Sequence, residues 1–351
     1  MMSAPTALPD ANLMFAPVLF ACGAVVSAAL TAFARRYALR RQLLDHPGQR
    51  RSHTLPIPRG GGIGPVVVML IGGVLFAALD PQSRQSLAIC LFGLVAVAGI
   101  GWLDDHRPLP ALPRFAVHLG AALAASIALL GMPQTAMQIV AVAAGTVVVA
   151  GLVNAWNFMD GIDGIAASQA GLVALILLFG GWLAGTWWSL ALLLLAAMTG
   201  FLPFNVPRAR IFLGDVGSGA LGFVVACLLL RTVATGALSW PVAALPVSAF
   251  LIDSGMTLLL RIMRGKTWWQ PHREHLYQWL VRSGRTHVHV GTWYALWTLL
   301  AGALTMAVSR CSPAVGAWIS GGALLSGCLL WMRLRNRLWM VARHRRKYDR
   351  R

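Results

Sequence analysis

The sequence predicts an all-α, polytopic integral membrane protein. Its 351 residues are 58 % hydrophobic and only 11 % charged, whereas a soluble domain usually carries about 25 % charged residues. The apolar residues come in runs of roughly 18 to 23, long enough for a helix to cross a hydrocarbon core of about 30 Å. No strand-like alternation, internal repeat or low-complexity tract competes with this interpretation.

The apolar runs predict eleven transmembrane helices. We expect them at about 12–34, 62–80, 85–103, 114–132, 136–157, 164–184, 187–204, 217–233, 240–260, 290–309 and 314–334. The longer polar links all fall on one side of the membrane if the N-terminus lies outside. This predicts one transmembrane domain over 1–334 and a basic cytoplasmic tail over 335–351. The expected cytoplasmic loops are 35–61, 104–113, 158–163, 205–216 and 261–289.

The basic residues give the expected orientation. Of the 29 Lys and Arg, 24 lie in the proposed inner loops or the tail, and Arg114 and Arg333 lie at the inner ends of their spans, so only Arg84, Arg231 and Arg310 remain for the outer side. By the positive-inside rule, the N-terminus is then periplasmic and the C-terminus cytoplasmic. The net charge of +18 is thereby explained by topology and contact with anionic lipid headgroups, without a nucleic-acid partner.

Six of the 11 acidic residues gather in the inner loops, among Arg, His and Gly-rich turns. They are Asp104, Asp105, Asp160, Asp163, Asp215 and Glu274. Mg²⁺ prefers carboxylate oxygens and commonly takes substrate phosphates as further ligands. Arg binds phosphate, and Gly turns let backbone N–H groups approach an anion. These residue types predict a phosphate and metal site at the cytoplasmic face.

The stretch "NAWNFMDGIDG", residues 154–164, is the most informative of these loops. If Asp160 and Asp163 lie on a helical turn, their spacing puts both carboxylates on one face, where they repel unless a cation or a proton lies between them. Asn154 and Asn157 precede them on a similar face and are suited to bind a substrate hydroxyl or amide. The alternative is a solvated end of the fifth span, with Asp160 as a helix cap.

Four motifs in order resemble those of bacterial polyprenyl-phosphate sugar-1-phosphate transferases (MraY/WecA-like, glycosyltransferase family 4). They are Asp104-Asp105, "NAWNFMDGIDG", "FLGDVGSGALG" and a basic, His-containing loop after the ninth span. The resemblance covers about residues 50 to 290. It implies transfer of a sugar 1-phosphate from a UDP-N-acetyl sugar to undecaprenyl phosphate, with release of UMP, at the bacterial inner membrane. It also implies Mg²⁺ as the cofactor, with Mn²⁺ as the alternative, and allows a homodimer.

The resemblance implies roles for the residues of two motifs. Asp215 is the candidate Mg²⁺ ligand, and Asp105 is expected to support the metal or the substrate. Asp104 is the candidate base for the lipid phosphate, so both paired aspartates belong to the candidate catalytic set. Gly214 and Ser218, which flank Asp215, are candidate substrate contacts.

Other matching positions are expected to bind the substrates. Asn157, Asp160 and Asp163 match the family's "NxxDGxDG" stretch and should face the nucleotide sugar, with both aspartates in the catalytic set and Asn154 beside them. Arg59, in "SHTLPIPRGGGIG", offers a phosphate contact near the expected entrance of the lipid phosphate.

The loop after the ninth span departs from the family pattern. Relatives carry two or three clustered His there, whereas this chain reads "PHREHLYQ". His272, Arg273 and His275 are the candidates for binding the diphosphate. The departure favours the O-antigen initiating branch, with donors such as UDP-FucNAc or UDP-QuiNAc, over transfer of UDP-MurNAc-pentapeptide in peptidoglycan synthesis. An amphipathic interfacial helix, "HREHLYQWLVRSG", is the structural alternative.

Two features remain outside these motifs. Asp253 lies within the ninth span, where a charge is costly, so we expect it to face the bundle interior as a supporting residue paired with Arg261 or Arg264. The stretch "RTHVHV" is expected to be a plain loop end.

A secondary transporter is the rival class for a protein with this many spans. Transporters usually place polar residues near mid-membrane in repeated halves, whereas nearly all acids here lie at one face. The sequence therefore favours an enzyme.

Overall fold

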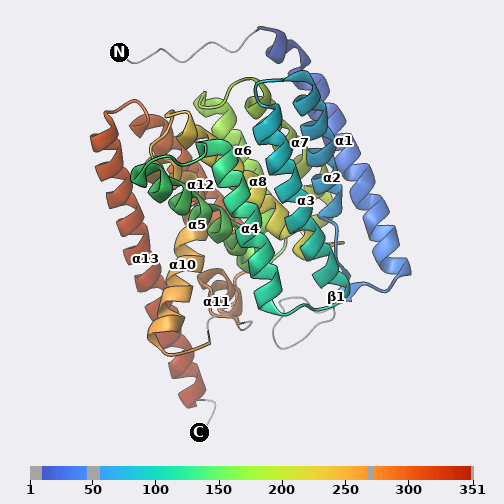
Figure 1. Ribbon diagram of the computed structural model, residues 1–351. Coiled ribbons are helices and arrows are strands. Elements are labelled where there is room, and N and C mark those ends of the chain that lie inside the picture. Colours follow the sequence, from blue (N-terminus) through green and yellow to red (C-terminus); the bar gives the residue numbers. More distant parts are fainter. Residues whose placement is uncertain (1–9, 46–55, 268–271, 349–351) are drawn as a thin grey trace.

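The computed structural model describes residues 10–45, 56–267 and 272–348, and the side chains of 10–13 and 342–348 are not described. The middle of the expected loop 35–61 and the last residues of the expected tail lie outside these ranges. Helices account for most of the described chain (Figure 1). The long ones are α1 (Asp10–Arg40), α2 (Ile63–Leu79), α3 (Arg84–His106), α4 (Ala111–Leu130), α5 (Ala136–Met159), α6 (Ile165–Gly180), α7 (Gly185–Asn205), α8 (Asp215–Ala234), α10 (Ser248–Met263), α12 (His287–Val308) and α13 (Pro313–Tyr348).

The expected spans coincide with apolar helices. Nine segments of the described chain are long and apolar enough to cross a membrane, and two shorter apolar helices, α2 and α6, fall on the second and sixth expected spans. At 17 and 16 residues, these two lie near the lower limit for a spanning helix. The expected all-α, polytopic membrane fold is confirmed.

The ninth span is not one continuous helix. It consists of α9 (Trp240–Ala243), a 3₁₀ turn over Leu245–Val247, and α10. Pro246 lies in the 3₁₀ turn, and a proline inside a helix removes one backbone hydrogen bond and clashes with the preceding turn. The interruption follows from this residue.

The last helix is longer than expected. α13 runs without a break from Pro313 to Tyr348. The boundary expected between a span ending at 334 and a tail beginning at 335 therefore falls inside a helix.

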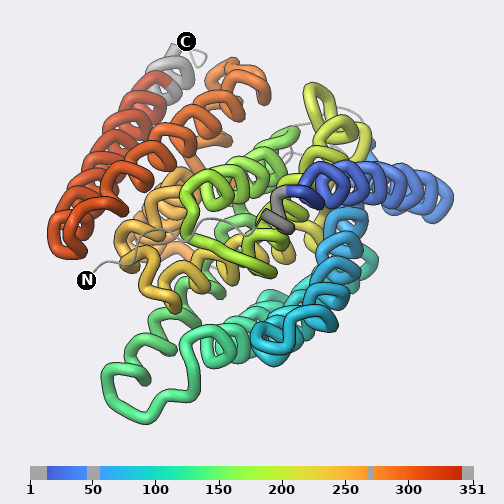
Figure 2. Tube along the Cα trace, turned by 90° about the horizontal axis from the view of Figure 1, so that it is seen from above, coloured from blue at the N-terminus to red at the C-terminus, as the bar shows by residue number. Residues whose placement is uncertain are grey.

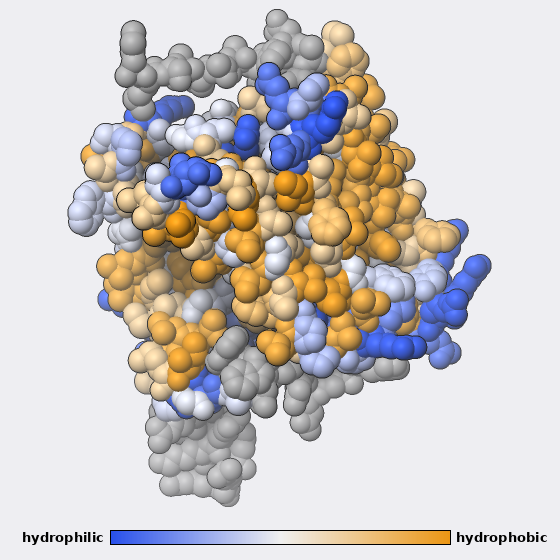
Figure 3. Space-filling view, in the orientation of Figure 1, coloured by the Kyte–Doolittle hydropathy of each residue, from blue (hydrophilic) through white to orange (hydrophobic). Residues whose placement is uncertain are grey.

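α8 is the central helix of the bundle. In the apolar 18-residue stretch of this helix, 89 % is buried, whereas the corresponding share is 17 % in α1 and 22 % in α13. Viewed along the bundle, α1 lies at one edge and the pair α12 and α13 at another (Figure 2). Much of the visible outer face is apolar, with hydrophilic residues gathered toward its two ends (Figure 3). The first residues of α8 are therefore held by protein on most sides.

A short glycine-rich segment covers the beginning of α8. The strands β1 (Leu44–Asp45) and β2 (Ile57–Pro58) form a two-residue antiparallel ladder, too short to show in the sequence. After it, Gly61 and Gly62 donate backbone hydrogen bonds to the carbonyls of Phe212 and Leu213, at 2.8 and 2.9 Å. A Cβ on Gly62 would lie only 2.2 Å from the Cα of Gly217. Two backbones meet here with no room for a side chain.

Gly62→Ala should therefore destabilise the protein. The backbone angles of Gly62 suit any residue, so the cost is steric; overpacking typically costs about 1–3 kcal/mol. We expect a lower melting temperature in detergent for this variant. Gly99→Ala, where nothing lies within 4 Å of the new Cβ, is the control. Equal melting temperatures for both variants would contradict the close contact.

Candidate active site at one end of the bundle

Two carboxylates from different helices converge on one cationic nitrogen. Nη1 of Arg114, in the first turn of α4, lies 2.7 Å from Oδ2 of Asp104 and 2.8 Å from Oδ2 of Asp215. Asp104 is in the last turn of α3 and Asp215 is the first residue of α8. The structure thus brings together two of the predicted residues. From the sequence, Arg114 is only a basic residue at the inner end of the fourth expected span.

Asp105 holds the beginning of α8. Its two carboxylate oxygens accept hydrogen bonds from the backbone N–H groups of Asp215 and Val216, both at 3.1 Å. The first N–H groups of a helix have no partner within the helix, and a carboxylate there also interacts favourably with the helix dipole. A Cβ on Gly214, which has a φ of +73°, would lie 2.5 Å from Oδ2 of Asp105. This geometry gives Asp105 a positioning role toward Asp215.

Arg59 is tied to the same aspartate. Its Nη2 donates to the backbone carbonyl of Asp105, and its Nε lies 3.9 Å from Oδ1 of Asp105. The Arg59 side chain remains 28 % exposed, so its guanidinium lies at the edge of the carboxylate cluster. The phosphate contact expected for Arg59 remains a prediction.

The "NAWNFMDGIDG" stretch is a helix end followed by a turn. α5 ends at Met159 and Asp160 caps its C-terminus, so Asp160 and Asp163 do not share a helical face. Asn157 accepts a hydrogen bond from the hydroxyl of Ser218 on α8, at 3.2 Å. Asn154 instead donates to the carbonyl of Ala150 in its own helix, at 2.7 Å.

Asp160 carries an unusual carboxyl group. Burial, together with the negative charges of Asp105 and Asp163, raises the pKa of Asp160 to about 7. Near neutral pH this carboxyl is therefore divided between its protonated and charged forms. A bound cation would favour the charged form.

Two polar residues with no role predicted from the sequence, His287 and Asn205, hold the turn that follows α5. Oδ2 of Asp163 lies 3.2 Å from Nδ1 of His287, the first residue of α12. The N–H of Gly164 donates to Oδ1 of Asn205 at 2.8 Å, and Asn205 itself is buried. "RTHVHV" is therefore not a plain loop end, because its first His pairs with a predicted site residue. Neither pairing has a local sequence signal, since each joins residues far apart in the chain.

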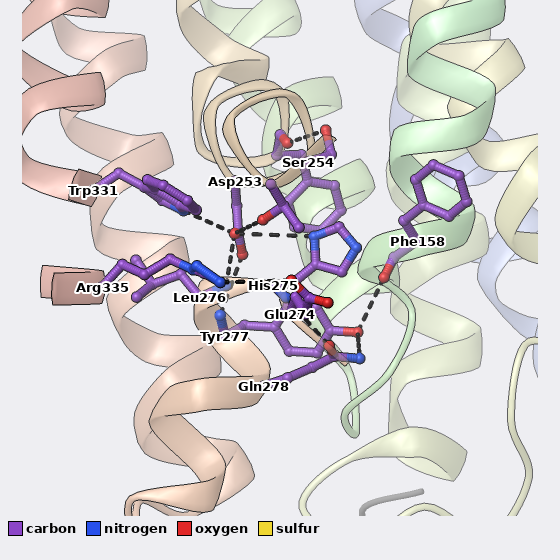
Figure 4. Close-up of polar contacts among 12 residues, drawn as sticks. Phe158, Asp253, Ser254, Glu274, His275, Leu276, Tyr277, Gln278, Trp331 and Arg335 are labelled. Carbon is purple, nitrogen blue, oxygen red and sulfur yellow. Dashed lines mark hydrogen bonds and ion pairs between the residues drawn. The ribbon is translucent and has the colours of Figure 1, made fainter. Parts of the chain in front are cut away.

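The helix α11 (Leu276–Arg282) is held against this turn by a buried aspartate (Figure 4). Asp253 accepts hydrogen bonds from the backbone N–H groups of Leu276 and Tyr277, at 2.7 and 3.2 Å. It also accepts from Tyr294 Oη at 2.7 Å and Trp331 Nε1 at 2.9 Å. These donors offset the cost of burying a carboxylate in the membrane region. The expected pairing of Asp253 with Arg261 or Arg264 is wrong, because α11 folds back and presents its N-terminus to Asp253.

Tyr277 connects α11 to the 158–161 turn. Its hydroxyl donates to the carbonyl of Phe158 at 3.0 Å (Figure 4). A Cβ on Gly161 would lie 2.1 Å from this hydroxyl oxygen, so a side chain there would push α11 away. The expected interfacial helix at "HREHLYQ" is thus a short helix packed on the candidate site.

Arg261 pairs with Glu274, just before α11. Its Nη1 lies 2.6 Å from Oε1 of Glu274, and Nζ of Lys266 lies 2.9 Å from the same oxygen. Nη2 of Arg335, on α13, approaches Oε2 at 3.8 Å. Glu274 therefore joins α10 and α13 to the segment that precedes α11.

The histidines of this segment are neutral. Burial, together with the neighbouring His275 and Arg261, lowers the pKa of His272 to about 4. Burial also lowers the pKa of His275, whose Nδ1 is 4.0 Å from Oδ1 of Asp253. Nδ1 of both rings has no hydrogen-bond partner in the described part of the chain. Arg273 lies between them and its carbonyl accepts from Arg282.

The pair Asp104 and Asp215 fits a divalent cation. Among the described residues, no group of three or more His, Cys, Asp and Glu is placed to hold a metal. Mg²⁺ in phosphate-transferring sites, however, commonly uses one or two carboxylates and takes waters and substrate phosphates as its other ligands. Two carboxylate oxygens that already share one cationic nitrogen meet that requirement.

Part of the chain is similar to a known protein family. Residues 87–233, which contain Asp104, Asp160 and Asp215, match the family described as "Glycosyl transferase family 4". This part of the chain is therefore similar to glycosyl transferase family 4. Its matched region includes both carboxylates of the Arg114 cluster and the "NAWNFMDGIDG" stretch.

Several curated relatives match over most of their length. A "Probable undecaprenyl-phosphate N-acetylglucosaminyl 1-phosphate transferase" of Bacillus subtilis (strain 168) is 28 % identical over 297 residues, which are 79 % of this chain and 80 % of the relative. An "Undecaprenyl-phosphate alpha-N-acetylglucosaminyl 1-phosphate transferase" of Yersinia pestis is 29 % identical over 93 % of each chain. A "Decaprenyl-phosphate N-acetylglucosaminephosphotransferase" of Mycobacterium tuberculosis (strain CDC 1551 / Oshkosh) is 29 % identical over 78 % of each chain.

The raised pKa of Asp160 predicts a pH-dependent gain in stability for Asp160→Asn. Between about pH 4, where an unfolded Asp ionises, and pH 7, the folded state keeps a proton that the unfolded state has lost. Stability from this group therefore falls as the pH rises through that window. In EDTA, Asp160→Asn should raise the melting temperature more at pH 8 than at pH 5.

Asp80→Asn is the control for this measurement, because hydrogen bonds from Ser83 and Thr186 lower the pKa of Asp80. A lowered pKa stabilises the fold above about pH 4, so this variant should not gain stability at either pH. An equal gain for Asp160→Asn at both pH values would contradict the raised pKa.

Asp253→Asn should loosen α11. Both oxygens of Asp253 accept hydrogen bonds, whereas Asn replaces one of them with an NH₂ group that faces at least two of the five donors. Hydrogen bonds to a charged group contribute about 1.5–3 kcal/mol, so trypsin should cleave the 264–285 segment at least about tenfold faster. Ser254→Ala is the matched control, because Ser254 bonds only the carbonyl of Phe250 in its own helix. Unchanged cleavage in folded Asp253→Asn would refute the capping role.

Proposed function

We propose that this protein transfers a sugar 1-phosphate from a UDP-N-acetylhexosamine to a polyprenyl phosphate, undecaprenyl phosphate in particular. The products would be polyprenyl-diphospho-sugar and UMP. The observation that most supports this proposal is the convergence of Asp104 and Asp215 on one cationic nitrogen. The names of the relatives give the same class of acceptor and an N-acetylhexosamine phosphate.

The carboxylate pair would serve the phosphate chemistry. Asp215 and Asp104 would hold Mg²⁺, or Mn²⁺, which would offset negative charge on the diphosphate. The second pKa of a phosphate monoester is about 6, so the lipid phosphate is largely ionised and asks little of Asp104 as a base. Asp105 would keep Asp215 in place through the first turn of α8, in support of the metal.

The nucleotide sugar would lie against the turn after α5. Asn157, Asp160 and Asp163 offer amide and carboxylate groups to sugar hydroxyls, and Asn157 shares a hydrogen bond with Ser218. Arg273 and the neutral rings of His272 and His275 would donate to the diphosphate, and Arg59 would contact the lipid phosphate. The two rings would act as hydrogen-bond donors and not as charges, because the pKa of each is lowered.

The identity of the donor sugar is the most specific part of the proposal. The altered segment "PHREHLYQ" favours 6-deoxy donors such as UDP-FucNAc or UDP-QuiNAc, whereas the names of the relatives favour N-acetylglucosamine. Both belong to the initiation of O-antigen or another envelope polysaccharide. UDP-MurNAc-pentapeptide is the remaining alternative donor.

The bacterial inner membrane is the proposed location. The candidate site lies where the helices α3, α5 and α8 reach the same end of the bundle, and most basic loops gather there. This end would face the cytoplasm, where nucleotide sugars are available, and its basic residues would contact anionic lipids.

Release of UMP tests the proposed reaction. Purified protein with undecaprenyl phosphate and Mg²⁺ should release UMP with at least one donor from a panel of UDP-GlcNAc, UDP-FucNAc, UDP-QuiNAc and UDP-MurNAc-pentapeptide. Asp215→Asn should lower kcat/KM by about 100-fold or more, the order seen when one electrostatic contact to a transition state is lost. Asp349→Asn, the same charge change in the C-terminal tail, should retain activity. Folded protein that releases no UMP with any donor would refute the proposal.

A further inference from the structure

Arg114 occupies the place where the carboxylate pair would hold a cation. One nitrogen, Nη1, lies 2.7 Å from Asp104 and 2.8 Å from Asp215. A Mg²⁺ ion needs carboxylate oxygens at about 2.0–2.1 Å, so each oxygen would have to approach a shared central ion by about 0.7 Å. The nitrogen and the ion cannot occupy this position together.

The guanidinium is held in a way that allows it to leave. Its Nη1 carries both carboxylate contacts, and its buried Nε has no hydrogen-bond partner among the described residues. The Arg114 side chain is 27 % exposed and that of Asp215 is 30 % exposed. The side chain therefore has solvent on one side and an unfulfilled donor on the other, unlike a fully engaged structural Arg.

Charge gives the reason for such a contact. Two carboxylates that face one point repel when nothing positive lies between them. Arg114 supplies one positive charge and leaves the pair with a net charge of −1, whereas a divalent ion would neutralise the pair. The guanidinium thus preserves the arrangement of α3 and α8 without binding as favourably as a divalent ion.

We propose that Arg114 is a displaceable internal cation, which competes with the divalent ion for Asp104 and Asp215 and binds substrate phosphate after it is displaced. This inference rests on the proposed function. Arg is suited to the second task because its planar guanidinium binds phosphate oxygens in a bidentate manner. Arg114 is therefore a positioning residue in the metal-free protein and a diphosphate ligand in the loaded one. It couples binding of the ion to binding of the nucleotide sugar.

Mn²⁺ binding, measured by electron paramagnetic resonance on the full chain in detergent, tests the competition directly. Arg114→Gln removes the competing charge and should lower the Kd for Mn²⁺ about tenfold. Arg114→Lys keeps one positive charge without the planar fork and should give an intermediate Kd. Arg107→Gln, an exposed Arg at the end of α3, removes the same charge nearby and should change the Kd less than twofold. Asp215→Asn identifies the signal that belongs to this site.

A stability measurement supplies an independent readout. Arg114→Gln should have a lower melting temperature than the wild type in EDTA, because its carboxylate pair is uncompensated, and should gain more than the wild type when Mn²⁺ is added. Preparing the variant with Mn²⁺ throughout keeps it folded if the metal-free form is too unstable to purify.

The outcomes separate this inference from the proposed function. Wild-type protein without Asp215-dependent Mn²⁺ binding would overturn the proposed metal site, and with it the competition. Site-specific Mn²⁺ binding that is equal or weaker in Arg114→Gln would overturn the competition alone and leave the transferase proposal standing. Tighter binding in Arg114→Gln but not in Arg107→Gln is the result we expect.

Discussion

The hydrogen bonds between Asp105 and the first turn of α8 are the contact on which the rest of the site depends. α8 is the most buried of the long apolar helices that the structure describes, and its first residue is Asp215. The carboxylate of Asp105 fixes where that helix begins. Gly214 can approach Asp105 only because it has no side chain. Asp104 directly precedes Asp105 in the last turn of α3. It therefore lies close to Asp215, and Arg114 bridges the two carboxylates.

A second buried carboxylate, that of Asp253, binds the first N–H groups of a helix in another part of the molecule. Asp253 caps α11 through the N–H groups of Leu276 and Tyr277, as Asp105 caps α8. Each aspartate is buried, and each fixes the start of a helix that adjoins candidate site residues. In a membrane protein with few charges, a buried carboxylate that satisfies several donors can orient a helix end precisely enough for chemistry.

Much of the fold could be predicted from the sequence, since apolar length alone locates a spanning helix. Residues in local motifs, such as Asp104, Asp160 and Asp215, could also be singled out. Contacts between distant segments could not, because no periodicity reports them. The contacts of Arg114 depend on where α4 begins. The contact of His287 with Asp163 depends on how α12 packs against the turn after α5. The expected partners of Asp253, Arg261 and Arg264, lie eight and eleven residues further along the chain, but α11 folds back and supplies backbone donors from 23 and 24 residues away.

The position of α13 has a consequence for how the enzyme is made. Trp331 and Arg335 lie in α13, far along the chain from α3, α4 and α8, and they contact Asp253 and Glu274, which hold α11 against the candidate site. A ribosome therefore completes the carboxylate cluster of α3, α4 and α8 long before it synthesises the helix that supports α11. The segment that packs on the candidate site therefore acquires its full set of contacts only after α13 has entered the membrane.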